Sequence, residues 1–192
     1  MSVQKAESVE INRRSFTVAE YERMGQFGIF SEDARVELVC GEIIQMSPIG
    51  ERHASCVATL AQLITLRLRL SALVWTQNPI VLDDYSEPQP DLALLKPRGD
   101  NYRTSKPTPD DVLLIIEVSD TTLEYDRKVK VPLYAAAGIP EAWVVNLPEE
   151  RIEVYSDPTG GEYQTVRSYT RGRRLQSHTL APLSLSVSKV LG

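Results

Sequence analysis

The chain has 192 residues, of which 42% are hydrophobic and 24% are charged, and its formal net charge is −5 at pH 7. These values are typical of one soluble globular domain with a real core, and no apolar run approaches the roughly 20 residues that a membrane-spanning helix requires. Because sequence-independent nucleic-acid binders are usually basic, a nucleic-acid partner would need a local basic patch, or metal ions that neutralise an acidic site.

The N-terminal end and the cysteines indicate the compartment. Residues 1–14 are polar and lack the apolar core of a signal peptide, so we expect a loose tail, a cytoplasmic location and a single domain over residues 15–192. Cys40 and Cys56 are too few for a disulfide framework. We expect both to be reduced and buried.

The first expected elements are a short helix and a hairpin. Thr17 and Glu20 have the spacing of a capping box, which predicts a helix that ends near Gly25. Residues 36–48 alternate around Gly41, which indicates a hairpin or a bulged strand. Glu37 lies in its first arm, where the ordinary interpretation is a solvated position.

The longest helical pattern covers residues 52–70, with apolar residues at helical spacing. His53 and Cys56 lie one turn apart near its start, but a zinc site would need further ligands, and His178 and Cys40 are remote in sequence. His53 is therefore either a polar residue at a helix start or a side chain that faces a site.

Three apolar runs are typical of strands. The run 74–82 is interrupted at Pro79, which indicates an edge strand or a bulge. The runs 92–95 and 112–116 contain no polar residue, which predicts strands buried on both faces. Residues 96–111, which connect these two runs, have the composition of an irregular loop.

Each buried strand carries a carboxylate at one end, where Asp91 precedes the first and Glu117 follows the apolar run of the second. If the two strands are antiparallel neighbours, these carboxylates converge. Hard cations such as Mg²⁺ and Mn²⁺ take oxygen ligands and often use one or two carboxylates. The pattern therefore indicates a divalent-cation site, against the ordinary interpretation of solvated charges at strand ends.

A helix and another strand follow, which makes a βαβ-like unit over residues 112–146. Asp126 and Lys130 are four residues apart and share one face of the expected helix, from which Lys130 can direct its ammonium at the carboxylates. Lys128 is the competing lysine. Pro132 predicts that the helix either starts late or is kinked. Gly138 suits the C-terminal cap.

The pattern of the C-terminal sequence predicts outer strands. The pairs near residues 152–154 and 163–166 indicate a meander with a turn at 157–161. Residues 171–174 form a basic turn, which is either a solvated tip or a phosphate contact. Residues 183–191 carry an apolar pattern that would dock on the core or on a partner.

Two sets of residues resemble a known family. Pro90-Asp91 followed by Glu117-Val118-Ser119 resembles the PD-(D/E)XK motif of the restriction-endonuclease-like superfamily. The run from Glu117 to Asn146 more narrowly resembles the bacterial Uma-type endonuclease family. Residues 36–43 and 47–53 also fit that family, so the resemblance covers residues 15–188. The residues of the longer run that carry it are Asp126, Lys130, Tyr134, Gly138, Ile139, Pro140, Glu141, Trp143, Val144 and Val145.

The resemblance implies an α/β (α+β) fold in which helices flank a mixed central sheet, with a restriction-endonuclease-like core and additional outer strands. It also implies a metal-dependent endonuclease that hydrolyses phosphodiester bonds in DNA. Asp91 and Glu117 would then bind Mg²⁺ or Mn²⁺ together with the Val118 carbonyl, Glu37 would be a third acidic group, and Lys130 would orient the attacking water. The groups expected to support these ligands or to contact substrate are His53, Asp126, Ser119 and Tyr134.

One position departs from the superfamily pattern, because Ser119 occupies the place of the last motif lysine. In the Uma-type family that lysine lies on the next helix, where Lys130 matches it. We expect a homodimer without a membrane partner, with DNA contacts through Arg67, Arg69 and the 171–174 turn. The alternatives are a catalytically silent nucleic-acid-binding or assembly module and the hydrolysis of a small phosphodiester.

Overall fold

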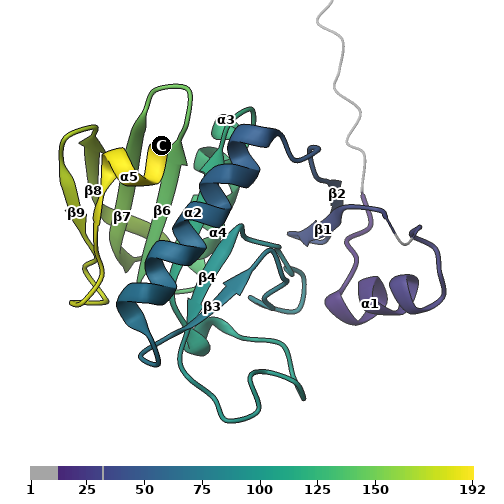
Figure 1. Cartoon of the computed structure of the whole chain (residues 1–192). Helices are drawn as coiled ribbons and strands as arrows, with labels where there is room; N and C mark the ends of the chain where they lie inside the picture. Colours follow the sequence, from purple (N-terminus) through teal and green to yellow (C-terminus); the bar gives the residue numbers. More distant parts are fainter. Residues whose placement is uncertain (1–12, 32) are drawn as a thin grey trace, which may run out of the picture.

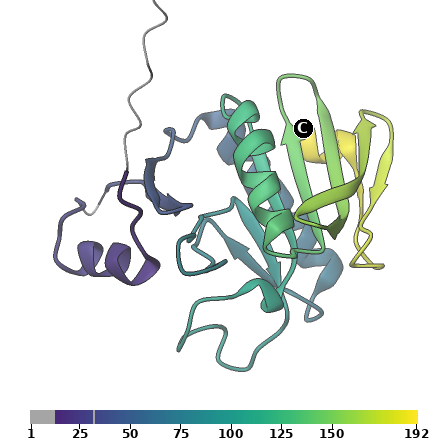
Figure 2. The same cartoon turned by 180° about the vertical axis from the view of Figure 1, so that it is seen from behind.

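A computed structural model describes residues 13–31 and 33–192, so most of the expected N-terminal tail lies outside the described residues. Six strands form a central sheet in the order β3-β4-β5-β6-β7-β8. Their bounds are β3 Leu73–Thr76, β4 Leu92–Leu95, β5 Val112–Ser119, β6 Glu141–Asn146, β7 Arg151–Thr159 and β8 Glu162–Thr170. Strands β5 and β6 are parallel and the other neighbouring strands are antiparallel. This mixed sheet between helices confirms the predicted fold class (Figures 1 and 2).

The central strands are apolar on both faces because helices cover both. Leu114 and Ile116 of β5 pack in a core that includes helix α2 (Glu51–Leu68), whereas Ile115 packs on the other face with Tyr134. Figure 1 shows α2 crossing one face, and Figure 2 shows the helix that follows β5 on the opposite face. This alternation is the expected result for a strand whose side chains point to opposite sides.

The C-terminal segment docks on this core, as one of the two sequence alternatives predicts. Strands β9 (Arg174–Gln176) and β10 (Ser184–Ser186) form a hairpin, and helix α5 (Val187–Leu191) packs against α2. The Cys56 thiol lies 3.5 Å from the Val190 carbonyl oxygen. Within the described part of the chain, none of the helices has the length and apolar character needed to cross a bilayer.

The N-terminal elements confirm the capping box and the hairpin. Helix α1 (Val18–Gln26) has Thr17 as its N-cap, and strands β1 (Val36–Val39) and β2 (Glu42–Gln45) pair around the turn Cys40-Gly41. Both turn residues have positive φ, which suits a two-residue hairpin loop. The expectation that Cys40 is buried is wrong, because this turn exposes its side chain to solvent.

Pro132 lies in the first turn of helix α4 (Val131–Ala136), where the late-start alternative puts it. Helical structure nevertheless begins earlier, at Leu123, as α3 (Leu123–Tyr125) and a π-helical segment η2 (Asp126–Lys130) that leads into α4. The Val131 N–H donates to the Asp126 carbonyl five residues back. The wider π turn replaces the regular turn that Pro132 would disrupt.

Two other element boundaries also differ. The strand predicted over 74–82 ends at Thr76, because Gln77 has a φ of 49° and Pro79 follows. The turn predicted over 157–161 shortens to Gly160-Gly161, since Pro158 and Thr159 still pair with β8. A Gly-Gly loop accepts the positive φ values that a tight hairpin needs, so pairing continues to the tip.

Candidate active site

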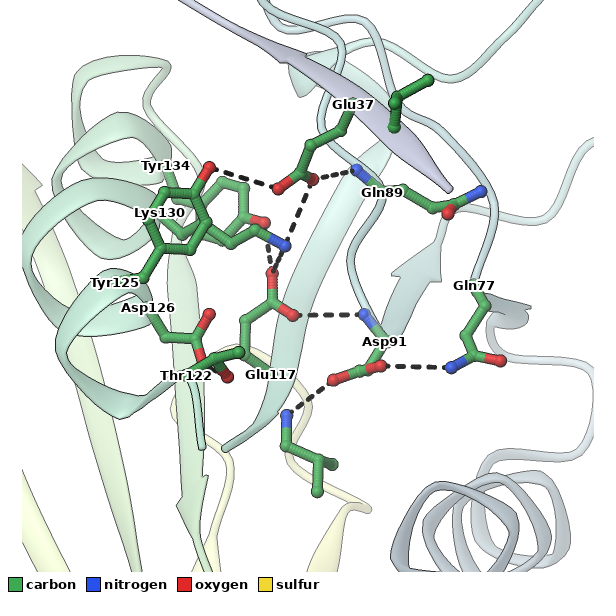
Figure 3. Close-up of polar contacts among 12 residues, drawn as sticks. Glu37, Gln77, Gln89, Asp91, Glu117, Thr122, Tyr125, Asp126, Lys130 and Tyr134 are labelled. Carbon is green, nitrogen blue, oxygen red and sulfur yellow. Dashed lines mark hydrogen bonds and ion pairs between the residues drawn. The ribbon is translucent and has the colours of Figure 1, made fainter. Parts of the chain in front are cut away.

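The start of β4 and the end of β5 lie side by side, and two carboxylates meet there. Leu92 pairs with Ile116 in an antiparallel ladder, which places Asp91 opposite Glu117. The Asp91 N–H donates to Glu117 Oε2 at 3.3 Å, and the Val118 N–H donates to Asp91 Oδ2 at 2.9 Å (Figure 3). The strand arrangement that the sequence argument required is therefore present, and each strand holds the carboxylate of the other.

Lys130 brings a positive charge to these carboxylates. Its Nζ lies 3.2 Å from Glu117 Oε1 and 3.3 Å from Glu37 Oε2 (Figure 3). Glu37 is 2% exposed, Glu117 3% and Lys130 4%, so all three are buried. The solvated interpretation of Glu37 is therefore wrong, because the hairpin that carries it folds against the end of the sheet.

The carboxylates also accept hydrogen bonds from uncharged groups. The Tyr134 hydroxyl donates to Glu117 Oε1 at 2.5 Å. Glu37 accepts hydrogen bonds from the Gln89 N–H at 3.0 Å and from the Tyr125 hydroxyl at 3.2 Å. These bonds fix the direction in which each carboxylate presents its remaining lone pairs.

The two candidate lysines lie in different environments. Lys128 is exposed and pairs with Glu124 at 2.5 Å, four residues back on the helix surface. Lys130 points from the same π-helical segment into the buried cluster. A two-residue step turns about 200° round a helix, so only one of these side chains can face the carboxylates.

Ser119, which replaces the motif lysine, contacts another predicted site residue. The Ser119 and Thr122 hydroxyls both donate to Asp126 Oδ2, each at 2.7 Å. Asp126 is buried, and its carboxylate lines the same cavity as Lys130. The hydroxyls therefore hold Asp126 at the first turn of the helix that carries Lys130.

His53 extends the cluster from the first turn of α2. Its Nε2 lies 2.9 Å from Asp91 Oδ2, while the Gln77 side-chain amide donates to Asp91 Oδ1 at 3.3 Å (Figure 3 labels Gln77 and Asp91). The His53 Nδ1 atom is buried without a hydrogen-bond partner in the described residues. The sequence left two roles open for His53, and the structure shows the second, because its side chain faces the site.

The cluster contains more carboxyl groups than ammonium groups. Burial raises the pKa of Glu117 to about 8, Lys130 acts in the opposite direction, and Asp91 adds to the rise. Burial alone would lower the pKa of Lys130, but Glu117 and Glu37 outweigh it and hold that pKa above its usual range. Burial also raises the pKa of Asp126. A cation bound here would relieve the repulsion between these carboxylates.

The donor set of Asp91 and Glu117 fits a hard divalent cation. Within residues 13–31 and 33–192, no group of three or more His, Cys, Asp or Glu side chains is positioned to hold a metal ion. Magnesium commonly uses one or two carboxylates and completes its shell with water and substrate phosphate. Asp91 and Glu117 are adjacent oxygen donors of this kind.

These groups open into a cavity of about 360 Å³. Its wall continues through the segment 46–50 that joins β2 to α2 and through the turn 120–122 that follows β5. Arg52, in the first turn of α2, contacts the turn that follows β5, since its Nη1 lies 3.3 Å from Asp120 Oδ1. The carboxylate cluster therefore lies inside a walled site.

Comparison with known proteins places the chain in a family. The model of the Uma2 family, described as "Putative restriction endonuclease", matches residues 18–188. The chain belongs to the Uma2 family. A solved structure from Anabaena variabilis, titled as a putative nuclease belonging to DUF820, is similar to this Uma2 chain with a TM-score of 0.73 and 16% identity. The match covers 92% of this chain and 97% of that one, so the fold is shared. A comparison with curated proteins found no match.

Three polar residues of this Uma2 site were not predicted from its sequence. Gln77, Gln89 and Tyr125 contact Asp91 or Glu37, and none of them was among the residues that carried the resemblance. Gln77 follows an interrupted strand, and its partner is 14 residues away in the chain. Only the pairing of β3 with β4 brings the two together, so no local signal was available.

Proposed function

We propose that this Uma2-family protein is a metal-dependent endonuclease that hydrolyses phosphodiester bonds in DNA. The observation that carries the proposal is the meeting of Asp91, Glu117 and Lys130, from three separate elements, at the wall of one cavity. The Uma2 family and the Anabaena variabilis protein are both described as nucleases, which supports the same class of reaction. A carboxylate pair beside a fixed ammonium is suited to phosphoryl chemistry.

Asp91 and Glu117 would hold Mg²⁺ or Mn²⁺ together with the Val118 carbonyl. Glu37 would bind through water or hold a second cation. The bound cation would lower the pKa of a water ligand and neutralise charge on the phosphate. The excess of carboxylates over ammonium groups in the cluster supports this assignment.

Lys130 would orient the attacking water. Its ammonium has a fixed direction because Glu117 and Glu37 hold it at 3.2 and 3.3 Å. Tyr134 fixes the Glu117 oxygen that Lys130 contacts. Asp126, held by Ser119, would position the start of the helix, and His53 would position Asp91. These groups act by orientation, which is the main protein contribution in phosphoryl transfer.

Incubation with plasmid and oligonucleotide DNA in Mg²⁺ or Mn²⁺ tests the proposal. We expect cleavage by the wild type, loss of cleavage in Glu117→Ala and Lys130→Met, and unchanged cleavage in the matched control Lys128→Met. Equal cleavage by the wild type and Glu117→Ala would show that the activity comes from elsewhere. Circular dichroism of each variant establishes that it is folded.

A catalytically silent binding or assembly module is the second candidate. The observation that favours it is that protein donors already engage Asp91 and Glu117, through Gln77, His53, Tyr134 and Lys130. Calorimetric titration with Mn²⁺ separates the candidates. Binding that Asp91→Ala abolishes supports the enzyme, whereas a wild type that binds no Mn²⁺ supports the module.

Contacts with DNA and with a second copy remain part of the proposal. Arg67 lies about 21 Å along α2 from His53, at the usual rise of about 1.5 Å per residue, so Arg67 and Arg69 would contact DNA far from the reacting groups. Arg171 is engaged by Glu150 at 2.9 and 3.0 Å. Sedimentation equilibrium tests the expected homodimer.

A further inference from the structure

The acidic groups are recessed, which limits what can reach them. Glu117 and Lys130 are nearly inaccessible, and the Asp91 side chain is 13% exposed. A phosphate must therefore enter the cavity rather than lie across an open surface. The cavity volume of about 360 Å³ is in the range of pockets that enclose one small molecule.

The walls of this cavity are tied to one another. The segment 46–50, which we call the strap, is held by the Met46 N–H, which donates to the Arg35 carbonyl at 2.9 Å, and by Arg35 Nη1, which donates to the Ser47 carbonyl at 2.7 Å. At its other end, a Cβ added to Gly50 would lie 4.0 Å from Asp120 Oδ2. The strap thus runs from the hairpin to α2, passes the turn after β5 and forms part of the cavity wall.

The strap presents apolar surface to the cavity that the carboxylates also line. Met46, Pro48 and Ile49 all line the cavity, and Ile49 is 43% exposed. Ile49 belongs to neither of the two hydrophobic core clusters of the described residues. An apolar side chain at this place can cover the flat apolar face of a nucleobase, while the carboxylates match a metal-bound phosphate.

The cavity offers few basic side chains that could contact the phosphates of a duplex. Among the described residues that line it, the basic side chains other than His53 are Arg35 and Lys130, and both already have partners on the strap or in the acidic cluster. Arg52 at the rim is engaged by Asp120 and by the Leu147 carbonyl. Duplex binders obtain most of their affinity from several Lys or Arg contacts with phosphates.

From these features we infer that the substrate is single-stranded DNA, one nucleotide of which enters the cavity with its base against the strap and its phosphate at Asp91 and Glu117. A paired nucleotide would first have to leave its stack, at a cost that an unpaired strand does not carry. This inference rests on the proposed function, since it names the substrate of the same site.

Fluorescence anisotropy tests the inference with a labelled single-stranded oligonucleotide and the matching duplex, both with Mn²⁺. We expect at least tenfold tighter binding of the single strand. Ile49→Ala should weaken single-strand binding by about fivefold, because the truncation removes apolar area that covers the base. The matched control Leu66→Ala, which truncates an exposed leucine of α2 outside the cavity, should leave it unchanged.

Duplex binding as tight as single-strand binding, or tighter, would overturn the inference. A protein that binds neither DNA would also overturn it. The same mixtures are then analysed for cleavage. Single-strand binding without cleavage of either DNA would refute the proposed function and leave standing only the binding of a single strand in this cavity. Cleavage that favours the duplex would refute the inference and leave the proposed function standing.

Discussion

Replacement of Lys130 with methionine removes the ammonium that two buried carboxylates share. Lys130 Nζ lies 3.2 Å from Glu117 and 3.3 Å from Glu37, in surroundings that exclude most water. Breaking a buried ion pair typically costs about 3–5 kcal/mol, because the remaining charge stays buried without a partner. Lys128 pairs with Glu124 on the exposed surface, so Lys128→Met should cost about 0.5 kcal/mol or less.

Urea unfolding measures both free energies, and the buried Trp143 is a suitable fluorescence reporter. A double variant sharpens the test. Glu117→Gln together with Lys130→Met should regain part of the loss, since one of the stranded carboxylates is then neutral. If the free energies of unfolding of Lys130→Met and Lys128→Met agree within about 0.5 kcal/mol, the buried ion pair does not stabilise the protein as the structure indicates.

The other predictions concern residues outside the cluster. Ellman's reagent should titrate one thiol per native chain, and Cys40→Ser should abolish that reaction, because Cys40 is exposed whereas burial raises the pKa of the Cys56 thiol to about 12. Glu141→Ala should cost about 3 kcal/mol in urea unfolding, more than Glu141→Gln, because buried Glu141 accepts hydrogen bonds from three donors. Burial raises the pKa of Glu87 despite Lys106, so the folded protein binds this proton more tightly than the unfolded chain does. The contribution of Glu87 to the free energy of unfolding should therefore decrease as the pH rises above about 4.5. Glu87→Gln should therefore gain stability relative to the wild type between pH 5 and pH 7, and a constant difference would contradict this.

The convergence of the two carboxylates was predictable because it depends on strong local signals. Two uninterrupted apolar runs predict strands buried on both faces, and such strands belong in the centre of a sheet. Asp91 and Glu117 lie at the ends of these runs, so antiparallel pairing alone brings them together. The pattern of apolar runs therefore predicted that the two carboxylates meet if the strands are antiparallel neighbours, whereas the fold class was predicted from the resemblance to the Uma-type family.

The remainder of the site depends on contacts between distant segments. The burial of Glu37 follows from how the β1–β2 hairpin folds against the sheet, and no pattern within the hairpin reports it. The choice between Lys130 and Lys128 depends on the π-helical segment, which a 3.6-residue period does not predict. Cys40 was expected to be buried from its residue type, yet its position in a tight turn decides its exposure.

The central claim is that Asp91 and Glu117 hold a divalent cation with which the protein cleaves DNA. Its most direct test is DNA cleavage as a function of Mn²⁺ concentration, compared between the wild type and Glu117→Gln, which retains the shape of the side chain. The account predicts cleavage by the wild type that requires Mn²⁺ and is lost in the variant. Cleavage that is independent of Mn²⁺, or equal in the two proteins, would contradict it.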